Sequence, residues 1–313
     1  MRIYIVVLDQ VLKSYLEHIC GKSNVKTGVP LSKYTTFGIG GPAKFLVDVK
    51  SKGILVRLLS ALKYIEHPHR IIGMGSNLLV SDYGYDGVII RLKFQEIIEN
   101  GNIIYADAGA SLVSVSRYAE ALGLSGLEFA CGIPGTVGGA VYGNAGAFGS
   151  SISDVVVMVD VLRDGQIISV DNKDCKFGYR TSVFKKGGII LGAYFFLRHD
   201  DASSITARMQ EYTERRLASQ PAGHSAGSIF RNHSISGSMQ HVLPQNTSAG
   251  AMIDNLGLKG FSIGGAQVST KHANFIINTG GATAGDVKKL IALIKKRVKA
   301  TYGITLKAEI EMI

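Results

Sequence analysis

Short apolar runs and one helical repeat dominate the first third of the chain. The runs AKFLVDV, RIIGMG, NLLVS and GVIIRL have the length and composition of β-strands. Between the first two runs, apolar residues recur at helical spacing, at Ile54, Leu55, Leu58, Leu59 and Leu62. The pattern predicts a small α+β unit over residues 31–93, after an N-terminal helical extension over residues 1–30.

A second set of strand-like runs follows between Asn102 and Leu197. The runs NIIYADAG, DVVVMVDVLR, QIISVD and GIILGAYFFLR surround one helical pattern from Leu112 to Leu122, which Gly123 is expected to end. We therefore expect a second α+β unit over residues 94–199, built around the glycine-rich stretch GIPGTVGGAVYGNAGAFG.

The pattern changes at Asp200. A predicted helix runs up to the breaker SQPAGHSAG, and it is followed by the strand-like NFIIN, a basic helix and the closing strand-like run ITLKAEIEMI. The apolar positions of the basic helix share one face, which leaves its lysines in solvent: Val287, Leu290, Ile291, Ile294 and Val298. The sequence predicts a third domain over residues 200–313.

Composition and charge fit a folded protein. Hydrophobic residues make up 46% and charged residues 19% of the 313 residues, which argues against extensive disorder. No apolar run reaches the ~18 residues that span a bilayer, and the N-terminus has no signal-peptide cleavage site, so we expect a cytoplasmic protein without a membrane segment. The net charge of +10 is spread out, which favours a lysine-rich surface over nucleic-acid binding.

The number and spacing of the three cysteines indicate the redox state of the compartment. Cys20, Cys131 and Cys175 are widely spaced, with no CxxC pair and no nearby Cys/His quartet. They are expected to be free thiols in a reducing compartment, and no metal site is predicted.

Three glycine-rich, uncharged loops fall within the first half of the chain: FGIGGPA, GMGSNLL and GIPGTVGGAVYGNAGAFG. The first two lack the following helix and third glycine of a Rossmann fingerprint. GMGSNLL can instead form an anion nest from its backbone N–H groups, with Ser76 and Asn77 as additional donors. A simple glycine turn is the alternative for this loop alone, but the three loops together indicate a large planar or phosphorylated ligand that the backbone approaches closely.

Polar residues later in the chain add candidate chemistry. Arg180 in KFGYRTSVFKK can clamp a carboxylate or phosphate, although it can also be a surface residue. Ser228 in SAGSIFRNH lies outside any GxSxG elbow, so no hydrolase nucleophile is implied, and a serine in a loop is usually a turn former. Glu309 and Glu311 share one face of the predicted last strand, and spacing alone does not choose between them.

Seven segments in order resemble the motifs of one family. They are YTTFGIGGPA, GMGSNLLVSDYGYDGVIIRL, GLSGLEFACGIPGTVGGAVYGNAGAFG, FGYRTSVF, SAGSIFRN, GLKGFSIGGAQVSTKHANFIIN and LKAEIEMI. Any one motif is weak, but their order resembles the UDP-N-acetylenolpyruvoylglucosamine reductases (UDP-N-acetylmuramate dehydrogenases) from about Ser32 to the C-terminus. The short interval between Arg180 and Ser228 resembles the shorter, type II subclass, which lacks a tyrosine-bearing substrate loop.

The resemblance implies a fold and a reaction. The fold is α+β: a vanillyl-alcohol-oxidase-type FAD-binding unit of two α+β subdomains plus a C-terminal substrate-binding domain. The implied activity is the NADPH-dependent, FAD-mediated reduction of the enolpyruvyl ether of UDP-N-acetyl-3-O-(1-carboxyvinyl)glucosamine to UDP-N-acetylmuramate, a peptidoglycan precursor. FAD is expected to be noncovalent, with Cys131 a packing residue, and the protein to be a monomer. Another FAD oxidoreductase of the same superfamily, or a basic nucleic-acid-binding module, is the alternative.

The resemblance also assigns residues. Ser228 corresponds to the family's proton donor, and Arg180 and Glu309 correspond to its other catalytic positions, while Arg231 and Asn232 are expected to bind substrate. The glycine-rich loops correspond to loops that contact FAD, which gives the candidate cofactor-binding residues Gly73, Met74, Gly75, Ser76, Asn77, Leu78, Gly132, Ile133, Pro134, Gly138, Gly139, Asn144, Ala145 and Gly146. His233 departs from the proline usual in the family. A catalytic Glu309, so near the C-terminus, requires that the last strand be held in a sheet.

Overall fold

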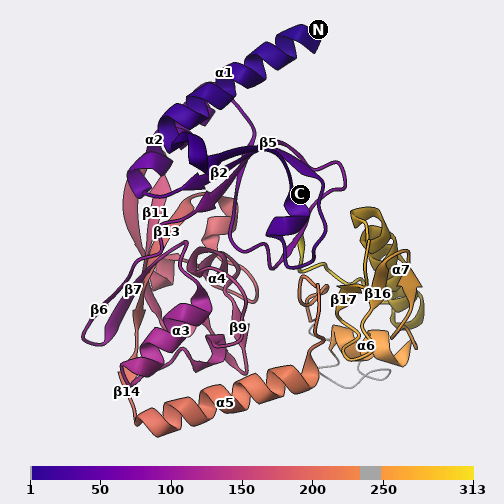
Figure 1. The fold of residues 1–313 in the computed structure, drawn as a ribbon. Coiled ribbons are helices and arrows are strands. Elements are labelled where there is room, and N and C mark those ends of the chain that lie inside the picture. Colours follow the sequence, from indigo (N-terminus) through magenta and orange to yellow (C-terminus); the bar gives the residue numbers. More distant parts are fainter. Residues whose placement is uncertain (1, 233–247) are drawn as a thin grey trace. The chain divides into compact units, whose positions relative to one another are not determined.

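The computed structural model describes residues 2–232 and 248–313, with side chains from residue 8 onwards. The chain forms two compact units, each discontinuous in sequence (Figure 1). Unit 1 comprises Met1–Val29, Ala43–Met74 and Asp86–Arg216, and unit 2 comprises Pro30–Pro42, Gly75–Tyr85 and Leu217–Ile313. The sequence-based domain boundaries after residues 30, 93 and 199 stay predictions.

The first sheet of unit 1 has four strands in the order β1 (Val25–Pro30), β2 (Pro42–Val49), β5 (Tyr85–Leu92) and β3 (His69–Ile72). Helix α2 (Lys52–Tyr64) begins where the Ser51 hydroxyl accepts a hydrogen bond from the Ile54 N–H. Its buried face has the predicted spacing, and helix α1 (Arg2–Cys20) contacts α2. The predicted helix over this region is therefore confirmed.

The second sheet of unit 1 has five antiparallel strands in the order β12 (Gln166–Asp171), β11 (Val156–Arg163), β13 (Ile189–Phe196), β7 (Ile103–Asp107) and β6 (Ile97–Asn100). Helix α3 (Leu112–Ala121) confirms the predicted helix, and Gly123 follows it with φ 66°. Helix α5 (Ala202–Ser219) belongs to this unit up to Arg216 (Figure 1). Two small pairs complete the unit: β8 (Leu124–Ser125) with β14 (Arg198–His199), and β9 (Gly146–Ala147) with β10 (Ser150–Ser151).

The glycine-rich stretch is partly helical, which the sequence did not predict. Helix α4 (Val137–Gly143) begins at Thr136, whose hydroxyl accepts a hydrogen bond from the Gly139 N–H, and it ends at Asn144 with φ 43°. It packs on β13 and β7 (Figure 1). The interpretation of residues 132–149 as a loop throughout is wrong, because a cap at each end stabilises one short helix there.

In its described residues, unit 2 combines a small antiparallel sheet with the helices α6 (Ala249–Asn255) and α7 (Ala284–Tyr302). The sheet order is β15 (Ser262–Ile263), β16 (Ala266–Val268) and β17 (Ile276–Asn278). A capping box of Thr283 and Asp286 starts α7, and Gly303 ends it. The five apolar positions predicted on one face of α7 are all buried, so the prediction is confirmed.

The predicted closing strand is wrong in its extent. Only β18 (Glu311–Met312) is a strand, and it pairs in parallel with β4 (Leu78–Leu79). Just before it, Ala308 bridges Phe230. The segment changes partner between these two pairings, so no continuous ladder forms.

The remaining helical elements are short 3-10 turns: Lys22–Asn24, Leu31–Tyr34, Glu128–Ala130, Ile152–Asp154, Asn172–Asp174 and Val183–Lys186. Among the helices of the described residues, none has the length and apolarity that a membrane crossing requires.

Candidate functional site

Two of the predicted cofactor loops meet within unit 1. Strand β3 ends at Ile72, and the next residue, Gly73, lies against the cap of α4: a Cβ added to Gly73 would lie 2.6 Å from Thr136 Oγ1. The start of GMGSNLL and the start of α4 are thus packed together, as a shared ligand would require.

The loop after β3 has backbone donors to offer. Within the described part of the chain, the backbone N–H groups of Gly73–Asn77 donate no hydrogen bond. By contrast, the first N–H groups of α4 are used, since Val137 donates to Ala110 O at 2.9 Å and Gly138 donates to Ala108 O at 2.9 Å. The loop after β3 therefore keeps the backbone donors that the predicted nest requires, whereas the start of α4 has already used its first two.

Many of the glycines are required by the chain's own packing. A Cβ at Gly138 would lie 3.0 Å from Ala108 Cβ, and one at Gly146 would lie 2.7 Å from Ser150 O. In unit 2, a Cβ at Gly41 would clash with Asp82 O, and one at Gly75 with Tyr34 O. Glycine density by itself therefore does not indicate a ligand, since close packing within the chain requires several of these glycines.

These contacts give a stability prediction. Gly73→Ala should destabilise unit 1 by about 1–3 kcal/mol, because the new Cβ must displace the Thr136 cap. Gly143→Ala is the matched control, since a Cβ there meets nothing within 4 Å. Urea denaturation of both variants measures the difference, and equal stability of the two would contradict the packing described for Gly73.

The side-chain amide of Asn144 is buried and forms its hydrogen bonds within the protein. It is 7% exposed, its Nδ2 donates to Gly178 O at 3.1 Å, and its Oδ1 accepts from the Ser153 N–H at 3.0 Å. The side chain predicted to contact the cofactor thus ties the glycine-rich stretch to the turn that carries Arg180.

Arg180 occupies a strained position in that turn. The backbone groups of Gly178 and Thr181 exchange hydrogen bonds of 3.0 and 3.2 Å across a two-residue loop, and Arg180 has φ 56°. A left-handed conformation costs a residue with a side chain about 1–2 kcal/mol, and glycine is usual here. The guanidinium Nη1 donates to Gly146 O at 3.1 Å. The structure thus holds an arginine against the glycine-rich stretch at a backbone position that disfavours it, which points to a function.

The remaining candidates of this stretch lie around the same elements. Ile133 donates its N–H to Ala130 O at 3.0 Å, and Ala145 donates to Ala140 O at 2.8 Å. Pro134 is exposed, and Gly132 packs beside the side chain of Arg216. Cys131 is 7% exposed, and its thiol donates to Met209 O, as expected of a packing residue.

Unit 2 places Ser228 in the middle of a three-segment pairing. Ser228 bridges Phe275 on one side. On the other side, the Glu309 N–H donates to Ile229 O at 2.8 Å, and the Arg231 N–H donates to Lys307 O at 3.0 Å. Two of the three candidate catalytic residues, Ser228 and Glu309, therefore lie on neighbouring segments, while Arg180 belongs to unit 1.

The C-terminal segment is held firmly, as a catalytic Glu309 requires. Asn77 Nδ2 donates to Glu309 O at 3.2 Å, and the Glu311 N–H donates to Asn77 O at 2.9 Å. The Ser81 N–H donates to Ile313 O at 2.7 Å. The condition that a sheet hold this segment is met by β18, which pairs with β4. Asn77, predicted to contact the cofactor, uses its amide to position Glu309.

The two candidate substrate residues differ in their contacts. Asn232 Oδ1 accepts from the Ala249 N–H at 3.1 Å, at the start of α6. The Arg231 Nε is buried and has no hydrogen-bond partner among residues 2–232 and 248–313. A buried donor of this kind favours a ligand acceptor. His233 lies outside the described residues.

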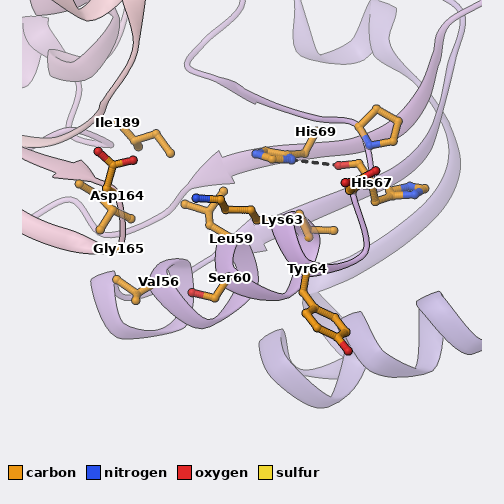
Figure 2. A pocket seen from close by; sticks show the side chains of 14 residues that line it. Val56, Leu59, Ser60, Lys63, Tyr64, His67, His69, Asp164, Gly165 and Ile189 are labelled. Atoms are coloured by element: carbon orange, nitrogen blue, oxygen red, sulfur yellow. Dashed lines mark hydrogen bonds between the residues drawn. The ribbon is translucent and has the colours of Figure 1, made fainter.

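A cavity of about 910 Å³ lies elsewhere in unit 1, near the start of β3 (Figure 2). Its lining includes His67, His69, Lys63 and Asp164, and His69 Nδ1 lies 3.1 Å from His67 O. Burial, with a smaller effect from Lys44, lowers the pKa of His67. None of the candidate residues lines this cavity, and Gly73 follows the opposite end of β3.

Two family descriptions match the chain. Residues 43–171 match the FAD binding domain, and residues 219–313 match the C-terminal domain of UDP-N-acetylenolpyruvoylglucosamine reductase. A solved reductase of that name from Thermus caldophilus is 37% identical, with a TM-score of 0.77, and the match covers 91% of this chain and 97% of the other. The FAD-binding α+β fold predicted from the sequence is thereby confirmed.

Curated relatives agree over nearly the whole chain. The reductase of Pediococcus pentosaceus is 44% identical over 288 residues, covering 91% of this chain and 92% of the relative. The reductase of Caldanaerobacter subterraneus subsp. tengcongensis is 41% identical over 310 residues, covering 98% and 99%. On this evidence, together with the ordered motifs, the chain belongs to the UDP-N-acetylenolpyruvoylglucosamine reductase family.

Proposed function

We propose that this chain reduces the enolpyruvyl ether of UDP-N-acetyl-3-O-(1-carboxyvinyl)glucosamine to UDP-N-acetylmuramate with NADPH. Family membership supports the reaction. The observation that carries the assignment of residues is the hydrogen bond from the Glu309 N–H to Ile229 O, which joins the segments of two candidate catalytic side chains in unit 2.

When bound, FAD supplies hydride-transfer chemistry between NADPH and the substrate. The residues proposed to hold it are those of the loop after β3, whose N–H groups from Gly73 to Asn77 suit the diphosphate, and those around α4. A Cβ at Gly143 would meet nothing within 4 Å, so the chain leaves open space at this position of α4, which suits a planar ring.

The reaction consumes one hydride and one proton. The hydride adds to the methylene carbon, the π-electron pair of the C=C bond moves to the adjacent carbon, and that carbon takes the proton, so NADPH is oxidised and the ether is reduced. Ser228 is proposed to donate this proton from its Oγ and to recover one from water. A serine hydroxyl is a weak acid, but an enolate carbon is a strong base, and positioning favours the transfer.

Charge develops next to the substrate carboxylate during this transfer. Arg180 is proposed to bind that carboxylate and stabilise the charge, which is typically the largest contribution to catalysis. Glu309 is proposed to orient the polar groups around Ser228. Arg231 is proposed to bind substrate through its buried Nε, and Asn232 to complete the same contact surface.

We further propose a monomer that acts in the cytoplasm without nucleic acid or membrane. Free, buried thiols support a reducing compartment. Burial raises the pKa of Cys20 and of Cys175 to about 11, so both stay protonated and unreactive at neutral pH.

Steady-state NADPH oxidation under anaerobic conditions tests the reaction. The purified yellow protein should oxidise NADPH only when the enolpyruvyl substrate is present. UDP-N-acetylglucosamine, which has no enolpyruvyl group, is the matched control. A colourless protein with salt-dependent affinity for DNA or RNA would instead favour the nucleic-acid alternative.

A further inference from the structure

We infer that Asn274 is a positioning residue that fixes the segment carrying Ser228. The inference rests on the proposed function, because it concerns the proposed proton donor. Asn274 is 4% exposed and immediately precedes the Ser228 partner Phe275. It lies in the run NFIIN, where the residues that follow it up to Ile277 are apolar.

The side chain of Asn274 hydrogen-bonds to both backbone groups of Phe230, as a neighbouring strand would. Its Oδ1 accepts from the Phe230 N–H at 3.0 Å, and its Nδ2 donates to Phe230 O at 2.8 Å. Its backbone O accepts from the Ile229 N–H at 2.8 Å. One buried residue therefore satisfies three backbone groups within two residues of Ser228.

These bonds also connect Ser228 to Glu309. Phe230 is 1% exposed and bridges Ala308, the residue before Glu309, while Ile229 O accepts from the Glu309 N–H. The segment is thus held from both sides, and Asn274 supplies one side through a side chain. Loss of its amide would leave buried backbone groups of Phe230 unpaired and let the segment move, which should misplace Ser228 Oγ.

Asn278 is a matched control, because it is a second asparagine with a fully used amide in the same unit. Its Nδ2 donates to Phe37 O at 3.2 Å, and its Oδ1 accepts from the N–H groups of Gly280 and Ala282 at 3.0 and 3.1 Å. These side-chain bonds go to segments other than the one that carries Ser228, and the backbone bond from the Asn278 N–H to His224 O at 2.9 Å survives substitution by alanine. A general loss of stability should affect both variants alike.

The test compares Asn274→Ala and Asn278→Ala in the FAD-loaded enzyme. Hydrogen exchange of the Phe230 amide should rise at least about tenfold in Asn274→Ala only, while Asn278→Ala should raise exchange at Gly280 and Ala282. In anaerobic stopped-flow, Asn274→Ala should slow reoxidation by the enolpyruvyl substrate at least about tenfold and leave reduction by NADPH unchanged. Equal effects on both half-reactions, or none on reoxidation, would overturn the inference.

Asn274→Asp keeps the inference testable if the alanine variant does not fold. A carboxylate can accept from the Phe230 N–H but cannot donate to Phe230 O, whereas a protonated carboxyl group can do both. Reoxidation by Asn274→Asp should therefore be slow at high pH and recover as the pH falls and the carboxyl group takes up a proton. A pH profile that matches the wild type would contradict the role.

Measurements on the wild-type enzyme and on Ser228→Ala distinguish a failure of the proposed function from a failure of the inference about Asn274. If the substrate does not reoxidise the wild type, the proposed function fails. If it does, and Ser228→Ala slows this step while Asn274→Ala does not, the proposed function stands and only the inference about Asn274 fails.

Discussion

Ser228→Ala should slow reoxidation of the reduced flavin by the enolpyruvyl substrate by about 10²–10⁴-fold, the range typical of losing a general acid. Reduction by NADPH should remain nearly intact, because the proton is needed only after hydride reaches the substrate. The structure supports the specificity of this effect: the segment 228–231 is paired on both sides, so removing one hydroxyl leaves its backbone bonds in place. Stopped-flow absorbance of the flavin measures both half-reactions.

Ser225→Ala is the control for this prediction. Ser225 lies in the same loop, and its hydroxyl accepts only from the Gly227 N–H at 3.2 Å among the described contacts of its side chain. It should change both half-reactions by less than about threefold, as expected for loss of one neutral turn hydrogen bond. Slowing of both half-reactions alike in Ser228→Ala would contradict the proton-donor role and indicate a misfolded loop.

Arg180→Gly should lower activity without lowering stability. Reoxidation by substrate should fall by about 10²–10³-fold, because the charge on the substrate carboxylate loses its clamp. Stability should rise by up to about 1 kcal/mol or stay unchanged, because glycine relieves the left-handed backbone at φ 56° at the cost of the hydrogen bond to Gly146. Urea denaturation and stopped-flow on the same sample measure the two effects.

Lys176→Gly is the matched control for Arg180. Lys176 also has a left-handed backbone, φ 46°, and its side chain is 71% exposed beside Asp174. The substitution should give the same relief of strain with no loss of reoxidation. A large loss of stability in Arg180→Gly would show that the guanidinium holds the turn together, and activity equal to wild type would remove Arg180 from the mechanism.

Local patterns predicted the long helices, because their information lies within a few residues. The apolar spacing of α2, α3 and α7 and the end of α3 before Gly123 are properties of neighbouring positions. Helix α4 was missed because glycine is a poor helix former, and its stability comes from Thr136 and from packing on Ala108. Tertiary contact outweighed propensity at this point.

The features that were not predicted depend on pairing between segments that are distant in the sequence. Residues 307–313 pair first with the Ser228 segment and then with β4, and no periodicity in ITLKAEIEMI reveals that change of partner. Glycines 41, 75 and 138 are also required by neighbours distant along the chain, which the sequence could not show. Candidate residues found by motif order are distributed over both units, and the supporting role of Asn77 became visible only with its bond to Glu309.

Asn274 was also missed at the sequence level. The available signal was a polar side chain at the start of the strand-like run NFIIN, where burial is expected. A buried asparagine must satisfy both its donor and its acceptor. Its partner, Phe230, lies 44 residues away in the sequence, so the pairing could not be inferred from spacing.

A single-turnover experiment tests the central claim most directly. The enzyme is reduced with one equivalent of NADPH without oxygen and is then mixed with one equivalent of UDP-N-acetyl-3-O-(1-carboxyvinyl)glucosamine. The flavin absorbance should return fully, and mass spectrometry should find UDP-N-acetylmuramate in an amount equal to the enzyme. A flavin that stays reduced, or that reoxidises without forming this product, would contradict the proposed function.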